Sequence, residues 1–286
     1  MKTFVFILVQ HLLPQHLLSR AIGRLAGSRN SVIKRTFIHW FVKRYRVDLS
    51  EAAQPDPDAY ADFNSFFTRA LKPGARPIAA GTHDVVCPAD GAISQLGNIE
   101  HNRIFQAKGR SFSVEALLGG DSSMAQPFYG GQFATVYLSP RDYHRVHMPL
   151  AGRLQKMIYV PGKLFSVNKA TADNVDALFA RNERLVCLFD TAAGPMAVVL
   201  VGAMIVAGIE TVWAGQVCPV SASAQVSTDY SSASPVTLAK GEEMGRFKLG
   251  STAIVLFGPN AVTLDPTLRA DSAVRMGQKL GTLAGA

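Results

Sequence analysis

Short apolar segments separated by glycine and proline dominate the chain after Gly81, and they constrain the fold most. Their lengths and their β-branched and aromatic residues are typical of strands. The expected strands are Val85–Cys87, Phe133–Leu138, Arg153–Val160, Arg184–Phe189, Met196–Val201, Trp213–Pro219 and Ala253–Phe257. Short helices are expected at Tyr60–Leu71, Ser111–Leu118 and Asn174–Phe179. Many short strands with few helices predict an α+β fold built on a compact, β-rich domain.

The uncharged stretch Ala192–Ile209 is long enough to suggest a membrane-spanning helix. Gly202 and Gly208 would interrupt such a helix, and its valines and isoleucines favour strand. We therefore expect a buried hairpin here.

Composition narrows the class of protein. Of 286 residues, 48% are hydrophobic and 17% charged, which excludes intrinsic disorder and allows one large or two small domains. The three cysteines, Cys87, Cys187 and Cys218, are widely spaced and form no CxxC pair. They indicate a reducing compartment and small core residues rather than a disulfide scaffold or a zinc ribbon.

The positive charge is concentrated at the start of the chain. Nine Lys and Arg residues precede the first acid, Asp48, whereas the net charge of the whole chain is +8. Apolar residues recur at helical spacing from Leu17 to Leu25 and from Val32 to Phe41, with cations on other faces. The breaker cluster at Pro55–Asp58 then predicts a boundary between an amphipathic helical segment, 1–54, and a domain, 55–286.

Basic helices with Leu, Phe and Trp on another face suit the headgroup layer of an anionic membrane. The apolar run Phe4–Val9 is too short to span a bilayer. Packing of these faces on the protein's own core is the alternative. Nucleic acid is not expected as a partner, because no zinc-finger, ribonucleoprotein or KH pattern accompanies the charge. Peripheral membrane association is the leading interpretation.

Three places combine reactive side chains with turn residues. Asp90 lies in the turn Cys87–Gly91, His144 and His147 lie between Pro140 and Pro149, and Ser251 follows Gly250 in Lys248–Thr252. An acid, a base and a hydroxyl in this chain order can form a nucleophilic set. Ordinary turns and incidental histidines are the simpler interpretation of each place alone.

Two other classes of function stay open from these residues. Asp90, His144 and His147 could serve a zinc-dependent hydrolase, although HxxH on a loop differs from the helical HExxH arrangement. Alternatively, the chain could be a membrane-docked carrier or scaffold without catalysis, although no lysine lies in a recognisable attachment motif.

Taken together, the three places resemble bacterial phosphatidylserine decarboxylase proenzymes. Leu249–Thr252 matches the LGST signature of that family, and Pro88–Gly91, Tyr143–Pro149 and Pro161–Asn168 are similar to its other motifs. The likeness extends from the basic start of the chain to Phe257, and the tail after Pro259 is the least informative part.

The resemblance implies a proenzyme that cuts itself between Gly250 and Ser251. Asp90 would support His147, His147 would deprotonate Ser251, and Ser251 would become a pyruvoyl group, the Schiff-base site for substrate. The two fragments, 1–250 and 251–286, would stay associated as a heterodimer. No metal is expected.

The implied reaction converts phosphatidylserine to phosphatidylethanolamine and carbon dioxide, in phospholipid biosynthesis. His144 would be the proton donor in decarboxylation, and Ser166 is a weaker candidate for contacting pyruvoyl or substrate. The expected location is the cytoplasmic face of the bacterial inner membrane, as a peripheral protein. A homodimer is expected only from the frequency of symmetric pairing among soluble enzymes.

Overall fold

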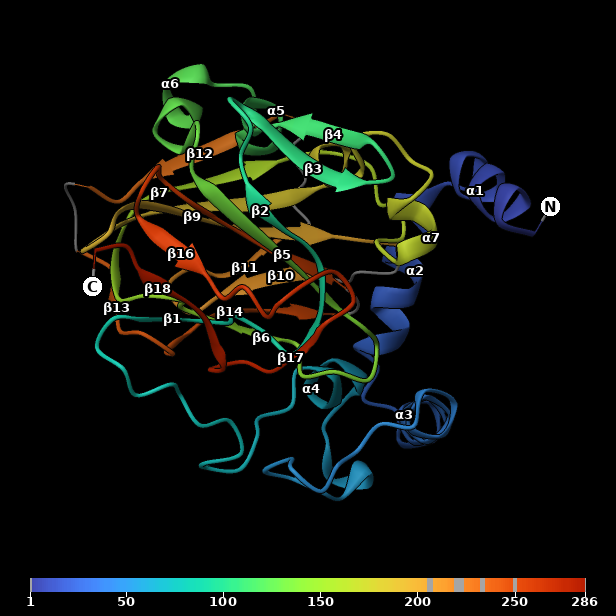
Figure 1. Cartoon of the computed structure of the whole chain (residues 1–286). Coiled ribbons are helices and arrows are strands. Elements are labelled where there is room, and N and C mark those ends of the chain that lie inside the picture. The colour runs from blue at the N-terminus through green and yellow to red at the C-terminus, as the bar shows by residue number, and fades with distance from the viewer. Residues whose placement is uncertain (1, 205–207, 219–223, 232–234, 249–250, 286) are drawn as a thin grey trace.

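Three helices at the start of the chain run along one side of a β-rich body (Figure 1). The computed structural model describes residues 2–204, 208–218, 224–231, 235–248 and 251–285. The three helices are α1 (Lys2–Leu12), α2 (Gln15–Ala26) and α3 (Ser31–Tyr45). Asn30 begins α3, because its side chain accepts hydrogen bonds from the backbone amides of Val32 and Ile33. Within the described ranges, no helix has the length and apolar character needed to cross a membrane.

The body is organised around one large antiparallel sheet. Among the described residues its strand order is β12-β7-β8-β9-β15-β5-β2-β17, and β13 also pairs with β7. Their bounds are β2 (Gly91–Asn98), β5 (Gln132–Leu138), β7 (Gly152–Val160), β8 (Arg184–Thr191), β9 (Gly194–Gly202), β12 (Val226–Asp229), β13 (Thr237–Leu238), β15 (Ser251–Phe257) and β17 (Ala273–Val274).

Smaller sheets cover one face of the large sheet. One has the order β11-β10-β14-β6 and another the order β1-β18-β16. Their strands are β1 (Asp84–Val86), β6 (Arg145–His147), β10 (Gly208–Thr211), β11 (Gly215–Cys218), β14 (Glu243–Lys248), β16 (Val262–Leu264) and β18 (Lys279–Leu283). Side chains from these strands share one buried apolar cluster with those of β5, β8, β9 and β15.

The opposite face is covered by a hairpin and short helices. These are β3 (Arg103–Ala107), β4 (Arg110–Ser113), α5 (Val114–Leu118), α6 (Ser122–Ala125), η2 (Gln126–Phe128), α7 (Lys169–Ala172) and α8 (Leu178–Arg181). A second apolar cluster lies beneath several of them. Every residue of β15 is buried, since this strand lies between two neighbouring strands and two apolar layers.

The predicted α+β class and the N-terminal helical segment are confirmed. Ala192–Ile209 forms no helix in its described part: β9 pairs with β8 as a buried hairpin, and residues 205–207 lie outside the described residues. All of the expected strands are present with shifted ends, although Pro219 also lies outside the described residues.

The expected short helices are only partly correct. Tyr60–Leu71 contains one short helix, α4 (Phe63–Phe67), which a capping box of Asp62 and Ser65 begins. The short 3-10 helix η1 (Pro57–Ala59) ends just before this range. In Ser111–Leu118 the first residues belong to β4, and Ser113 caps the helix that follows. The helix predicted at Asn174–Phe179 is wrong in position. Ala177 has a left-handed backbone, with φ 48°, and separates α7 from α8.

The N-terminal helices have both buried and exposed apolar residues. Ile38 and Phe41 of α3 pack against α4, and the rings of Phe37 and Phe63 stack with centroids 4.1 Å apart. Val32 and Trp40 on the same helix are 71% and 53% exposed. Helix α3 therefore packs on the protein's own core with one face and presents apolar residues to the outside with another.

Candidate active site

Strand register brings the predicted sites to one end of the large sheet. Ser251, the first residue of β15, lies opposite Leu138 at the end of β5 and opposite Gly202 at the end of β9. Asp90 immediately precedes β2, in which Ala92 lies opposite Tyr137 of β5. The Asp90 turn, the end of β5 and Ser251 are therefore neighbours across three adjacent strands.

The glycine after Asp90 is required by this close approach. A Cβ atom on Gly91 would lie 2.1 Å from the carbonyl oxygen of Tyr137, and the φ of +153° is one that other residues rarely adopt. Without a side chain, the turn can rest directly on β5.

The segment from Ser139 to His147 returns to the same end. The carboxylate of Asp142 accepts a hydrogen bond of 2.7 Å from the amide of Ser139, which closes a turn after β5. The amide of Phe247, four residues before Ser251, donates to the carbonyl of His144 at 3.0 Å. The backbone of His144 is thus hydrogen-bonded to β14, the strand that precedes Ser251.

Ser251 is fully buried, and its hydroxyl has no hydrogen-bond partner among the described residues. A buried hydroxyl without a partner carries a free-energy penalty, and the hydroxyl of the neighbouring Thr252 is in the same state. The structure therefore leaves the Ser251 oxygen uncommitted. Gly250, the other residue of the expected cut, lies outside the described residues.

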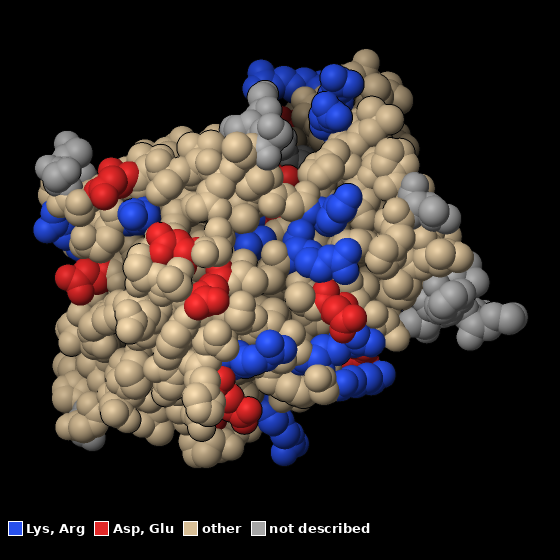
Figure 2. Space-filling view, turned by 90° about the horizontal axis from the view of Figure 1, so that it is seen from above, with Lys and Arg blue, Asp and Glu red and all other residues tan. Residues whose placement is uncertain are grey.

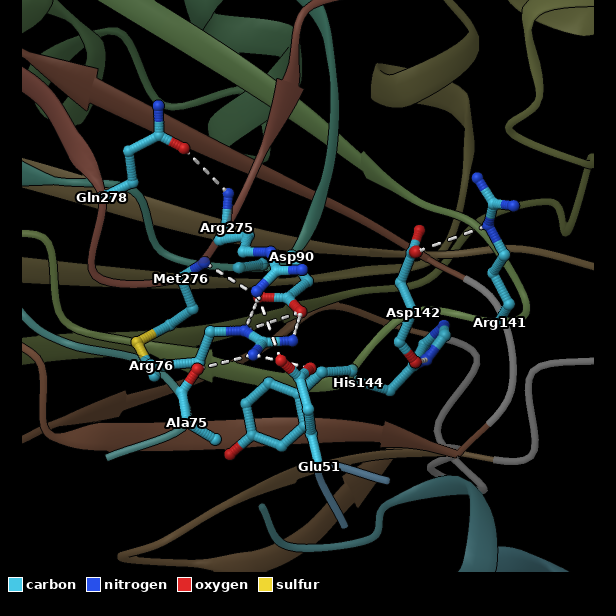
Figure 3. Close-up of polar contacts among 12 residues, drawn as sticks. Glu51, Ala75, Arg76, Asp90, Arg141, Asp142, His144, Arg275, Met276 and Gln278 are labelled. Atoms are coloured by element: carbon cyan, nitrogen blue, oxygen red, sulfur yellow. Dashed lines mark hydrogen bonds and ion pairs between the residues drawn. The ribbon is translucent and has the colours of Figure 1, made fainter. Parts of the chain in front are cut away.

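Asp90 is held in place by a guanidinium and a backbone amide (Figure 3). Arg76 donates from Nε to both carboxylate oxygens, at 2.9 and 3.0 Å, and from Nη2 at 2.5 Å. The amide of Met276 donates to the same carboxylate at 2.9 Å. Arg76 also pairs with Glu51 at 2.9 Å, and the two acids raise the pKa of its guanidinium.

Both ring nitrogens of His147 have partners close to the Asp90 turn. Nδ1 lies 2.8 Å from the carbonyl oxygen of Gly241, and Nε2 lies 3.1 Å from the hydroxyl of Tyr143. The amide of His147 donates to the carbonyl of Pro88 at 2.8 Å, which places the histidine beside the turn. Asp90 and His147 are thus neighbours whose side chains bond to other groups.

Burial lowers the pKa of His147, while the hydrogen bond to Gly241 and the negative charges of Glu243 and Asp90 act in the opposite direction. Since Nδ1 donates to a carbonyl in the neutral ring, Nε2 is the acceptor, and the Tyr143 hydroxyl donates to it. Burial raises the pKa of Tyr143 to about 12, which keeps that hydroxyl protonated. The arrangement gives His147 a basic nitrogen at neutral pH.

His144 is more deeply buried than His147. Its Nδ1 lies 2.8 Å from the carbonyl oxygen of Asp142, and its Nε2 has no partner among the described residues. Burial lowers the pKa of His144 to about 3. The ring of Phe67 lies against it, with centroids 4.0 Å apart.

Ser166 lies on a loop that the buried side chain of Asn182 links to the end of β9, beside Ser251. The side chain of Asn182 donates to the carbonyl of Phe165 at 2.8 Å and to that of Gly202 at 2.9 Å. Gly202 is the residue opposite Ser251 on β9. The loop that carries Ser166 is therefore fixed beside the same strand ends.

Sequence reasoning missed Arg76, Tyr143 and Asn182 as parts of this site. Tyr143 lay inside the histidine segment and could have been included as a hydroxyl four residues before His147. Arg76 and Asn182 reach the site only through tertiary packing, and no local pattern marks them. In the described ranges, no group of three or more His, Cys, Asp and Glu side chains is placed to hold a metal ion.

Comparison with known proteins decides the family. The phosphatidylserine decarboxylase family model matches residues 63–282, and a model described as PSD matches residues 5–46. The chain belongs to the phosphatidylserine decarboxylase family. It is therefore a decarboxylase that converts phosphatidylserine to phosphatidylethanolamine.

Phosphatidylserine decarboxylase proenzymes of several pseudomonads match the chain along its length. The protein of Ectopseudomonas mendocina is 65% identical over 98% of this chain and 99% of its own length. That of Pseudomonas putida is 63% identical over all of both chains, and that of Pseudomonas aeruginosa is 64% identical over 98% and 97%. The resemblance to this family drawn from the sequence motifs is confirmed.

Proposed function

We propose that this phosphatidylserine decarboxylase is made as a proenzyme that cuts itself between Gly250 and Ser251. The observation that carries the proposal is the buried hydroxyl of Ser251, which has no partner in the part of the chain that the structure describes and lies at the sheet end of Asp90 and His147. Relatives of nearly the same length are named as proenzymes, which supports the same maturation here.

In the proposed cleavage, Nε2 of His147 takes the proton of the Ser251 hydroxyl, and the oxygen attacks the carbonyl carbon of Gly250. The peptide bond becomes an ester, and the amine of Ser251 is released from Gly250. Elimination across the Cα–Cβ bond of Ser251 then frees the carboxylate of Gly250. Hydrolysis of the remaining dehydroalanine gives ammonia and a pyruvoyl group.

Asp90 acts on His147 through its charge in this scheme. Arg76 and the amide of Met276 fix the carboxylate beside the Pro88 carbonyl that binds the His147 backbone. The fixed negative charge of Asp90 near His147 favours the imidazolium that His147 forms when it takes the proton of Ser251. The hydrogen bond from the Tyr143 hydroxyl to Nε2 of His147 must break when Nε2 takes the proton of Ser251.

The residues around Ser251 fit the pyruvoyl group proposed there, since the position is buried and its oxygen is uncommitted. That group supplies a carbonyl that withdraws electrons when carbon dioxide leaves the substrate. We assign to Nε2 of His144 the delivery of a proton to the former α-carbon. Ser166, fixed nearby through Asn182, is proposed to contact the substrate.

The proposal includes docking on an anionic membrane through residues 1–54. Exposed apolar side chains on α1, α2 and α3, and Leu13 between α1 and α2, accompany the nine cations of this segment. Those on the helices are Phe6, Leu8, Val9, Leu17, Leu25, Val32, Ile33 and Trp40. The face seen in Figure 2 instead shows basic and acidic side chains interspersed. Since the substrate stays in a bilayer, helices in the headgroup layer would bring residues 55–286 to it. The proposed location is the cytoplasmic face of the inner membrane.

Intact-mass analysis of the purified chain tests the proposal. Cleavage should give fragments of residues 1–250 and 251–286, the shorter one with a carbonyl-reactive, blocked end. Ser251→Ala should leave one uncut chain, and His147→Ala should do the same. An intact wild-type chain that decarboxylates phosphatidylserine would overturn the proposal, and chelator-sensitive activity with bound metal would favour a metal enzyme.

A further inference from the structure

A buried guanidinium lies next to the loop that carries His144. Arg69, just after α4, is 4% exposed, and burial lowers its pKa. Its Nη2 donates to the carbonyls of Arg141 and Asp142 at 3.0 and 3.3 Å. Its Nε and Nη1 are buried and have no hydrogen-bond partner among the described residues.

Such an arrangement is costly, since a buried cation with two unpaired donors loses much of its hydration energy. The carboxylates of Asp142 and Asp90 favour its charge only from a distance. Packing alone would be served as well by an apolar side chain. The hydrogen bonds from Arg69 to the carbonyls of Arg141 and Asp142 therefore indicate a role beyond packing.

One of these bonds ends on the carbonyl that orients His144. The oxygen of Asp142 accepts from Nη2 of Arg69 and also from Nδ1 of His144, at 2.8 Å. Because a carbonyl oxygen can only accept, the neutral imidazole carries its proton on Nδ1 and a lone pair on Nε2. The ring of Phe67, two residues before Arg69, packs on the same imidazole.

The charged groups around His144 come from several elements. Arg69 approaches from the end of α4, Asp142 from the preceding turn, and the pair of Arg145 and Glu243 joins β6 to β14. Of these, the positive charge of Arg69 adds to burial in lowering the pKa of His144. Arg69 thus influences both the tautomer and the charge of the imidazole.

We propose that Arg69 is a positioning residue for decarboxylation, which holds the Asp142 carbonyl so that His144 starts each turnover with an unprotonated Nε2. The inference rests on the role of His144 given above. A resting Nε2 without a proton cannot donate one, so it must first accept one. The substrate ammonium is the acid at hand, because its nitrogen must lose a proton before it can react with a carbonyl. Burial and the positive charge of Arg69, which lower the pKa of His144, lower the pKa of an ammonium placed beside it in the same way, so the proton can pass between them.

One proton passes from the substrate to His144 and back to the substrate in each turnover. The proton leaves the substrate nitrogen, resides on Nε2, and moves to the α-carbon, where it takes the electron pair left by carbon dioxide. Nε2 regains its lone pair, and the released amine takes a proton from water. His144 returns to the tautomer that Arg69 favours.

The test is nitrogen NMR of histidine-labelled mature enzyme, combined with turnover kinetics, in the wild type, Arg69→Gln and Arg69→Lys. Comparison with His144→Gln identifies the His144 signals. In the wild type, His144 should be protonated on Nδ1 and stay neutral below pH 6. In Arg69→Gln the tautomers should mix, the pKa of His144 should rise by about one unit, and kcat should fall about ten-fold at unchanged KM.

Arg141→Gln is the matched control, since its side chain lies on the same loop but is 68% exposed; it should behave as the wild type. Arg69→Lys keeps the charge but is too short to hold both carbonyls, so the tautomers should mix with a smaller pKa change. If Arg69→Gln does not fold, this variant decides alone. A wild-type tautomer and kcat in the folded variants overturn the proposal. If instead the wild-type chain does not split at Gly250, the proposed function fails, while the NMR signals still report on Arg69.

Discussion

The carboxylate of Asp90 accepts hydrogen bonds from both sides of the proposed cut. Arg76 precedes Ser251 in the chain, and Met276 follows it. Glu51, from the N-terminal segment, binds Arg76 and Arg275 and so joins the same network (Figure 3). The Asp90 network therefore joins the two fragments that the proposed cut would make.

Removing Arg76 should leave the buried Asp90 charge without its main partner. We expect Arg76→Gln, made in the uncut Ser251→Ala chain, to lower the free energy of unfolding by about 3–5 kcal/mol. Urea titration followed by circular dichroism measures this. Arg275→Gln is the control, because Arg275 binds the same Glu51 but is 65% exposed, so its loss should cost about 1 kcal/mol or less. Equal losses in the two variants would show that the buried pair contributes nothing special.

The rate of self-cleavage should depend on pH through His147. Only the neutral imidazole can accept the Ser251 proton, and burial places the pKa of His147 below its ordinary value of 6.5. The rate should therefore be constant near neutral pH and fall as the pH drops through that lowered pKa. Time courses of cleavage on gels measure it, and His144→Gln should leave the curve unchanged. A half-maximal rate above pH 6.5 would contradict the role of His147.

At the scale of elements, α3 offers two apolar faces that can be tested separately. Replacing Val32 and Trp40 by serine should weaken binding to anionic vesicles and lower stability less than a change in the buried face, because Val32 is 71% exposed and Trp40 is half-exposed beside other aromatic rings. Ile38→Ala should instead lower the free energy of unfolding by about 2–5 kcal/mol, because Ile38 is fully buried against α4. Vesicle flotation and urea titration distinguish the two effects, and unchanged flotation of the serine variant would refute docking by α3.

The strands were predictable because their apolar runs are buried on both faces. β9 and β15 contribute alternate residues to two different clusters, so each strand appears as a continuous run of valine, isoleucine and leucine. The helix expected at Asn174–Phe179 failed because a single left-handed residue, Ala177, interrupts it, and alanine gives no sign of that conformation. Local pattern therefore locates elements but not the backbone irregularities set by tertiary contacts.

The same limit applies to the site. Asp90, His144, His147 and Ser251 stood out as reactive residues in turns, and strand register brings their segments together. Arg69 and Arg76 were not singled out, because nothing near them in the sequence shows that their side chains are buried. Their burial depends on tertiary contacts: Arg69 donates to the carbonyl of Arg141, and Arg76 binds Asp90.

At the scale of the whole molecule, the proposed cut falls at the start of the strand that holds the sheet together. β15 pairs along its length with β5 on one side and β9 on the other, and all of its residues are buried. β17 and β18, further along the short fragment, pair with β2 and β1. Strands of the fragment 251–286 are therefore hydrogen-bonded to strands of the long fragment in two different sheets.

The two fragments of the mature enzyme should consequently separate only when the large sheet unfolds. Removing β15 would break two ladders of backbone hydrogen bonds and open both apolar clusters. In a urea series, size-exclusion chromatography should therefore show the short fragment leaving the long one at the urea concentration at which circular dichroism reports loss of strand structure. The uncut Ser251→Ala chain gives the reference transition. Release of the short fragment well below the unfolding midpoint would mean that cleavage loosens β15, and the fixed Asp90 network would then not outlast maturation.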